Sequence, residues 1–294
     1  AQAGLFDLNL LQKQRVLETY AYANVYEDYS SLLLQGKPRE GQSLEDVETL
    51  LLQEIDKLRT GDFEEWLPQA VVKDMRVTEI RDFEQNKGRA SALTSAFVLG
   101  IPWEEIVQRW EMYNRITKKD VMAFAQQHLR TDNYVAVYKH TGPDPSVIKV
   151  EKPPITPIEV NRSDLSPYAQ AFLQEPVPSI APQFLDFRKT IHTSKLGTSL
   201  PLHAIRDAGK PLFRLYYIYD IGKVNDRRFG ILASYLSYLG TSSRTAIEMH
   251  QAFFRIGVNF SATCQDERLF LTLTGLEESF EEAVALMESL LCDA

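Results

Sequence analysis

The chain has 294 residues, a mass of 33.6 kDa and a net charge of −8, with 44% apolar and 24% charged residues. This length predicts about two domains, and the composition predicts folded cores rather than disorder. The acidic balance excludes a general nucleic-acid binder, which needs a basic surface. No apolar run reaches the roughly 18 residues that a membrane-spanning helix requires, so no membrane span is expected.

The first part of the chain is predicted to be mainly helical. Residues 10–35 are expected to form a tyrosine-rich helix with its aromatic stripe in the core, ended by Gly36 and Pro38. Ser43 and Asp46 have the spacing of a capping box, which predicts a helix that ends at Gly61. The next helix is expected to start at Asp62, and residues 76–98 are expected to continue helically. Further helices are expected from Pro102 and from a cap at 117–120.

The period of the pattern then changes. Tyr134–Tyr138 is a short continuous apolar run, which predicts a strand that is buried on both faces. A single closing strand needs a sheet, and few earlier residues show strand character. Residues 1–142 are therefore expected to be the closing part of an αβ domain whose opening strands lie before residue 1.

Residues 143–186 are expected to be a linker between two domains. Nine of the 14 prolines fall between 143 and 183, and proline removes backbone donors and favours extended chain. The segment also carries many apolar residues. We therefore expect it to lie along a surface as a strap rather than as a free tether.

Residues 187–294 are expected to be the opening part of a second αβ domain. Strands are predicted at 189–194, 201–206 and 213–221, followed by helices over 226–239 and 244–255. A hairpin is predicted over 258–274 and a final helix over 277–291. The predicted fold class is thus α+β, with antiparallel sheets packed against helices.

Residues capable of catalysis are sparse. Cys264 and Cys292 are expected to be buried thiols, and no two histidines have the spacing that presents a metal site on a helix. Glu248, His250 and His203 are candidates for a site, although an isolated histidine needs an oriented partner before it can act in catalysis. No phosphate-binding loop, nucleophile elbow or zinc-binding helix motif is present.

Two stretches nevertheless resemble the insulinase/pitrilysin-type zinc metallopeptidases, the inverzincins. The first is Ser43–Gly142, in which the segment Leu50–Phe63 leads through the cap at Thr117–Val121 to Tyr134–Lys139. The second is Leu196–Leu291, in which helices end at Leu239-Gly240-Thr241 and at Ile256-Gly257 before a hairpin and a last helix. The ordered series carries the resemblance, which covers about two thirds of the chain.

The resemblance implies a protein of four related αβ domains in two linked halves that close around a peptide. In this family zinc sits on an HxxEH helix of the first domain, with a further glutamate downstream. The matching helix here holds Ile231, Ser234 and Tyr235 at those positions, and none of these replaces the ligands and base. The chain is therefore expected to match the end of the second domain and the start of the third, with no catalytic, metal-binding or cofactor residue of its own.

The resemblance thus implies the central, non-catalytic part of a zinc-dependent metalloendopeptidase, forming chamber wall and linker. Zinc would belong to the parent protein, and the expected partners are a peptide substrate and the flanking domains of the same chain. Self-association through uncovered sheet edges is also expected. Substrate-binding residues and the compartment are not assigned, although the resemblance agrees with a soluble protein of the periplasm or cell envelope.

Two other functions remain open. The chain would be part of a scaffold or assembly subunit if the parent's own zinc-binding helix is degenerate. It would be a stand-alone peptide-binding module if it has no such parent, binding an extended segment along a sheet edge.

Overall fold

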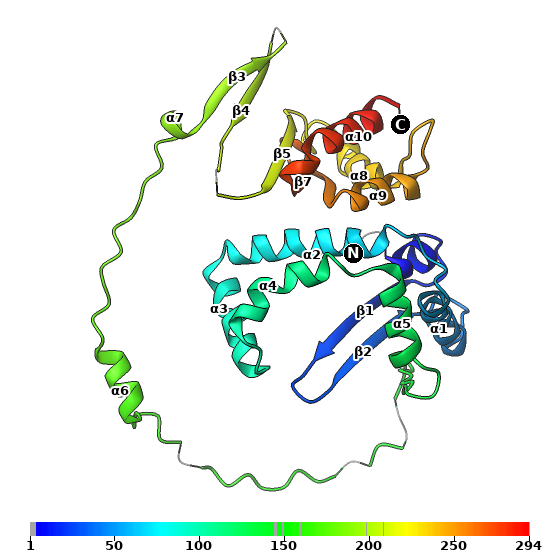
Figure 1. Ribbon diagram of the computed structural model, residues 1–294, viewed down its shortest axis with the longest axis vertical. Helices are drawn as coiled ribbons and strands as arrows, with labels where there is room; N and C mark the ends of the chain where they lie inside the picture. Colours follow the sequence, from blue (N-terminus) through cyan, green and yellow to red (C-terminus); the bar gives the residue numbers. More distant parts are fainter. Residues whose placement is uncertain are drawn as a thin grey trace. The chain divides into compact units, whose positions relative to one another are not determined.

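A computed structural model describes residues 4–143, 146–148, 150–158, 160–197, 199–207 and 209–293 (Figure 1). The chain is α+β, with helices and small antiparallel sheets, so the predicted fold class is confirmed. One unit comprises Ala1–Tyr138 together with Gly209–Ala294, and the other is Lys139–Ala208. The predicted domain limits at 142 and 186 stay predictions; residues 1–3 and 294, at their outer ends, lie outside the described residues.

The N-terminal segment is a hairpin, and the predicted helix over 10–35 is wrong. After a short π-helix, η1 (Asp7–Leu11), strands β1 (Glu18–Val25) and β2 (Ser30–Lys37) pair antiparallel. Tyr20 and Tyr22 alternate with alanines in the two-residue period of a strand, and aromatic residues favour strands. The tyrosines are exposed, because the core contact of the hairpin comes from its other face.

Helix α1 (Leu44–Thr60) packs against this hairpin and forms as predicted. The Ser43–Asp46 capping box is present, and Gly61 ends the helix with φ 78°. The buried core joins η1, α1 and the loop before β1, and it consists of Leu10, Val16, Val47, Leu50 and Leu51.

Four more helices follow: α2 (Leu67–Phe83), α3 (Asn86–Val98), α4 (Trp103–Tyr113) and α5 (Lys118–His128). The helix predicted over 76–98 is broken at Glu84 and Gln85, since Gln85 has an extended backbone with ψ 139°. The predicted cap at Thr117 and Asp120 is confirmed as a capping box.

Tyr134–Tyr138 was predicted to be a buried strand, and this is wrong. Within the described part of the chain it pairs with no strand, and Val135 and Val137 are each 86% exposed. Tyr134 Oη (2.9 Å) and Tyr138 Oη both donate to the carboxylate of Glu48 on α1. The segment is held by these side chains instead of a backbone ladder, and the hydrogen bond to Glu48 raises the pKa of Tyr138 to about 12.

The last part of the first unit is a three-stranded sheet covered on one face by helices. Strands β5 (Leu212–Tyr219), β6 (Val258–Cys264) and β7 (Leu269–Leu276) pair antiparallel in the order β5-β7-β6, so the predicted hairpin is confirmed. Helices α8 (Arg228–Tyr235), α9 (Ala246–Arg255) and α10 (Phe280–Asp293) bury its inner face, with 3-10 turns η2 (Leu236–Tyr238) and η3 (Glu277–Ser279). The core includes Met249, Phe253, Leu271, Leu273 and Met287.

The second unit holds the proline-rich segment. It contains α6 (Pro167–Gln174), α7 (Phe187–Thr190) and the antiparallel strands β3 (His192–Leu196) and β4 (Leu200–Ala204). The strand predicted from residue 189 therefore begins only at His192. The described apolar side chains of this segment are exposed, as with Ile148 at 86% and Ile180 at 91%, and the expectation that it lies along a surface stays a prediction.

The cysteines differ from each other. Cys264 is buried in β6 as predicted, whereas Cys292 is exposed because it lies in the last turn of α10. No helix among the described residues has the length and apolar character to cross a bilayer.

Candidate functional site

The outer face of the β5-β7-β6 sheet is the main surface that the helices leave open. Helices α8, α9 and α10 bury the opposite face, so alternate side chains of each strand point away from the core. The strand register aligns these side chains in three rows: Arg214–Thr274–Asn259, Tyr216–Thr272–Ser261 and Ile218–Phe270–Thr263. We call these nine residues the open sheet face.

The open sheet face has a polar end and an apolar end. Its first row carries a guanidinium, a hydroxyl and an amide, and its third row carries the side chains of Ile218 and Phe270. Tyr216 and Ile218 are 47% and 54% exposed. From the cation and polar groups of the first row to Ile218 and Phe270 of the third, the face offers both hydrogen bonds and apolar contact to an extended polymer.

Strand β5 also has a free edge. Among the described residues it pairs only with β7, so half of its backbone N–H and C=O groups have no ladder partner. Such an edge can accept an additional strand from a peptide, with main-chain hydrogen bonds supplying affinity and alternate side chains supplying specificity.

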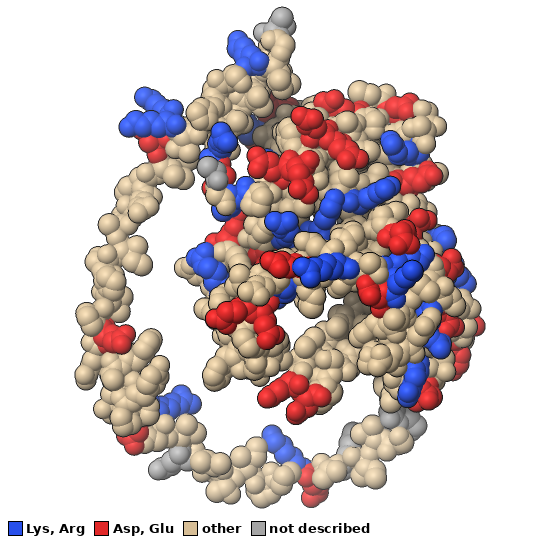
Figure 2. Space-filling view, viewed as in Figure 1, with Lys and Arg blue, Asp and Glu red and all other residues tan. Residues whose placement is uncertain are grey.

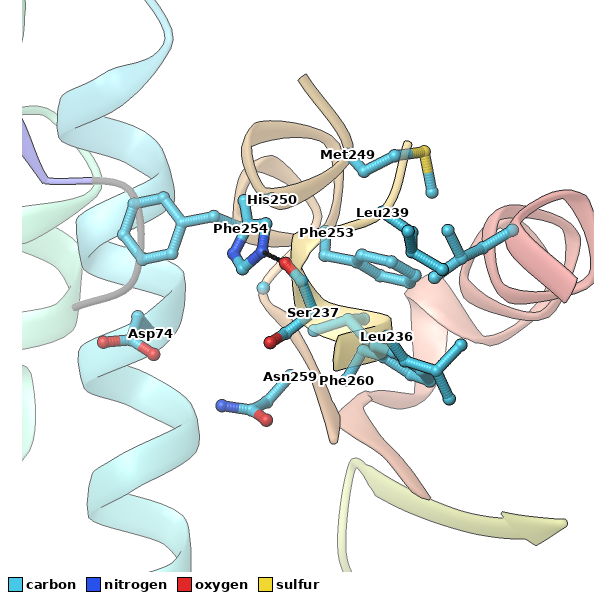
Figure 3. A pocket seen from close by; sticks show the side chains of 13 residues that line it. Asp74, Leu236, Ser237, Leu239, Met249, His250, Phe253, Phe254, Asn259 and Phe260 are labelled. Atoms are coloured by element: carbon cyan, nitrogen blue, oxygen red, sulfur yellow. Dashed lines mark hydrogen bonds between the residues drawn. The ribbon is translucent and has the colours of Figure 1, made fainter. Parts of the chain in front are cut away.

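A cavity of about 70 Å³ lies next to the polar end of the open sheet face. Its polar side chains are Asp74 of α2, Ser237 of η2, His250 of α9 and Asn259 of β6 (Figure 3). His250 Nε2 lies 2.6 Å from the carbonyl oxygen of Ser237 and donates to it, because a carbonyl only accepts. That imidazole N–H is therefore committed to the backbone and does not face a nucleophile.

Charged side chains of α2, Arg81 and Asp74, interact electrostatically at the polar end of the open sheet face, where Arg214 lies. Burial lowers the pKa of Arg81, the nearby positive charge of Arg214 lowers it further, and Asp74 acts in the opposite direction. Arg81 and Arg214 thus place two positive charges at this end of the sheet, beside the carboxylates of Asp74 and Glu84. Lys210 is already paired with Glu84, at 3.1 Å.

The residues at the positions that the resemblance assigns to zinc lie on α8. Ile231 and Tyr235 are 71% and 56% exposed, and Ser234 Oγ donates to the carbonyl oxygen of Gly230 at 3.2 Å. Across the described ranges, no group of three or more His, Cys, Asp or Glu side chains has metal-binding geometry.

The other candidates have local partners. Glu248 completes the capping box of α9 with Thr245, and these hydrogen bonds lower the pKa of its carboxyl. His203 of β4 contacts the hydroxyl of Thr193 in β3 at 3.1 Å. Of the three residues, only His250 lines the cavity.

Sequence reasoning did not identify the open sheet face. A signal was present, since Asn259, Ser261 and Thr263 alternate with core residues of β6, which is typical of a strand with one exposed face. The contributions of Asp74 and Arg81 could not be found this way, because α2 lies far earlier in the sequence.

No protein-family model and no curated protein matches the chain. Among solved structures, the periplasmic protease PqqL from Escherichia coli matches with a TM-score of 0.35 and 14% identity, over 99% of this chain and 35% of that chain. The chain thus spans about a third of the length of that structure.

Proposed function

We propose that the chain is a non-catalytic, peptide-contacting part of a zinc-dependent metalloendopeptidase that hydrolyses peptides or unfolded proteins. In this proposal the chain supplies chamber wall and the linker between two halves. The observation that carries it is the open sheet face beside the free edge of β5. The ordered resemblance along Ser43–Gly142 and Leu196–Leu291 supports the class of protein.

The open sheet face suits an extended peptide of mixed sequence. The edge of β5 offers main-chain hydrogen bonds, which do not depend on the sequence of the peptide. Thr272, Thr274 and Ser261 offer hydroxyls that both donate and accept, and Ile218 and Phe270 offer apolar contact. A peptidase wall needs this tolerance, because its substrates differ in side chains but share a backbone.

In this proposal, peptide-bond hydrolysis takes place in a part of the parent protein outside this chain. A catalytic zinc needs three protein ligands and an open position for water, and Ile231, Ser234 and Tyr235 provide no such set. The parent protein would hold the zinc, in a soluble protein of the periplasm or cell envelope. The flanking domains of the same chain would cover the remaining faces.

A second candidate function is a stand-alone peptide-binding module, and the free edge of β5 is the observation that favours it. A scaffold subunit from an inactive relative would use the same surface. All three functions predict peptide binding on the open sheet face. They differ in whether the natural full-length protein cleaves the bound peptide.

The test is a pair of substitutions on the open sheet face in the natural full-length protein. Tyr216→Ser combined with Ile218→Ser should raise KM for a quenched peptide about five-fold, the equivalent of ~1 kcal/mol, and leave kcat unchanged, because only substrate contacts are lost. Ile231→Ser on α8 is the matched control, since Ile231 is also exposed, and it should leave both constants unchanged. An unchanged KM in the double variant would remove the open sheet face from the proposed function.

A further inference from the structure

The hairpin β1–β2 has an unusual composition. Residues 16–36 contain four tyrosines (Tyr20, Tyr22, Tyr26 and Tyr29) and three carboxylates, and no lysine or arginine. The four tyrosines are between 49% and 69% exposed. Lys37, at the end of β2 on the same face as Tyr20 and Tyr22, pairs with Glu18 at 2.7 Å. The carboxylates of Glu27 and Asp28 are therefore the ones that invite a partner with cations.

The geometry places these groups on one side of the hairpin. Tyr20 and Tyr22 lie opposite Gln35 and Leu33 in the register, on the face turned away from α1. The other face packs on α1, where a Cβ at Gly36 would lie 2.4 Å from a methyl group of Val47. The outward residues, together with Tyr26 and Tyr29 of the loop, are here called the tyrosine face.

The loop of the hairpin adds negative charge. Tyr26 N donates to Tyr29 O at 3.1 Å, so Glu27 and Asp28 form the bend between them. The rings of Tyr26 and Tyr29 have centroids 5.1 Å apart. Neither Glu27 nor Asp28 forms an ion pair within the described part of the chain, and Figure 2 shows acidic side chains at the end of this hairpin.

We propose that the tyrosine face binds an extended peptide that carries lysine or arginine. Ammonium and guanidinium groups are attracted to the faces of tyrosine rings, and the carboxylates at the bend add charge attraction. Tyrosine with serine and asparagine is also the composition of protein surfaces that bind peptides at low entropic cost. Asn24, Ser30 and Ser31 supply the polar members here.

Charge decides between this partner and the alternatives. A second copy of the chain would bring the same carboxylates and a net charge of −8, so like charges would oppose each other. The negative phosphates of a nucleic acid would be repelled by the same carboxylates, which excludes it as the partner. The inference goes beyond the proposed function, because it concerns another sheet and holds whether or not the parent protein cleaves peptides.

The test is fluorescence anisotropy with the full chain and a labelled peptide of alternating lysine and threonine, beside a matched peptide with glutamate in place of lysine. The lysine peptide should bind more tightly, and added salt should weaken the binding. Tyr20→Ser with Tyr22→Ser should weaken it about three-fold per tyrosine. Tyr235→Ser with Tyr238→Ser is the matched control, because both side chains are exposed away from the hairpin, on α8 and η2, and it should change nothing.

A second variant keeps the test valid if the tyrosine variant fails to fold. Glu27→Gln with Asp28→Asn removes two exposed charges at the bend and should both weaken binding and flatten its salt dependence. Equal binding of the two peptides would overturn the proposal, as would hairpin variants that bind like the control. Sedimentation that shows self-association lost with the tyrosines, without peptide binding, would assign the face to a second copy and overturn it too.

Discussion

At the scale of single residues, the most informative side chain is Glu54 on α1. It is 1% exposed and accepts hydrogen bonds from Asn9 Nδ2 at 2.7 Å and from Lys57 Nζ at 2.8 Å. A buried carboxylate is tolerated only when its oxygens are satisfied, and here each oxygen has a partner. Glu54 thereby ties the segment before the hairpin to α1, which also supports the tyrosine face.

We predict that Glu54→Ala lowers the free energy of unfolding by about 2–3 kcal/mol, because it leaves Asn9 unpaired and removes a buried charge pair. Glu54→Gln should cost less, since the amide oxygen still accepts from Asn9. Asp56→Ala is the control: Asp56 pairs with Arg59 on the exposed side of the same helix and should have little effect. Urea denaturation measures all three, and equal losses at 54 and 56 would contradict this account.

Asp7 makes the stability of the folded protein depend on pH. Burial raises the pKa of Asp7, while a hydrogen bond from Gln12 and the charge of His250 oppose the shift. A raised folded pKa means that the ionised form is less stable in the folded protein, so the cost is present above the folded pKa. The cost disappears as the pH falls below the ordinary value of 3.8.

We therefore expect Asp7→Asn to increase the free energy of unfolding at neutral pH. The increase should vanish below pH 3.8, where the native carboxyl is protonated in both states. Thermal melts of both proteins across this range make the measurement. A gain that stays constant with pH would show that ionisation of Asp7 is not its cause.

At the scale of elements, the sequence predicts the ends of helices well and the pairing of strands poorly. The caps at Ser43 and Thr117 depend on side chains three residues apart, so they could be predicted and are confirmed. Whether residues 18–37 form a hairpin and whether Tyr134–Tyr138 forms a strand depends on which other segment is available for backbone pairing. Tyr20 and Tyr22 have the two-residue period of a strand, whereas the helix is predicted from the wider spacing of all four tyrosines.

The break between α2 and α3 depends on one glycine. A Cβ at Gly88 would lie 2.0 Å from the backbone oxygen of Asp82, so only glycine permits this close approach. The helix predicted over 76–98 did not take Gly88 into account. Its close approach to the end of α2 is the physical reason for two helices.

We predict that Gly88→Ala destabilises the protein by about 1–3 kcal/mol, through the clash with Asp82. The same substitution at Gly230 should stabilise by about 0.5–1 kcal/mol, since that helical glycine meets only the flexible side chain of Lys223 at 3.3 Å. Unfolding midpoints of the two variants should move in opposite directions. A stabilising Gly88→Ala would mean that α2 and α3 join into one helix.

At the scale of the whole molecule, the fold class could be predicted, and the candidate site could not. Helical and strand periods gave α+β, because these periods are local. The open sheet face joins three strands with Asp74 and Arg81 from α2, and only the tertiary structure brings them to one place. Self-association of the chain, and its place in a larger protein, stay predictions.

The central claim is that this chain contacts peptide while the zinc chemistry belongs to the rest of its parent protein. The most direct measurement is zinc content by elemental analysis, beside a quenched-peptide assay, for the purified chain and for the natural full-length protein. The full-length protein should hold zinc and show turnover that a chelator abolishes. The chain alone should show neither, and Ile231→His with Ser234→Glu and Tyr235→His should create at most a weak site, because the third ligand is missing. Stoichiometric zinc with chelator-sensitive turnover in the chain alone would contradict the account.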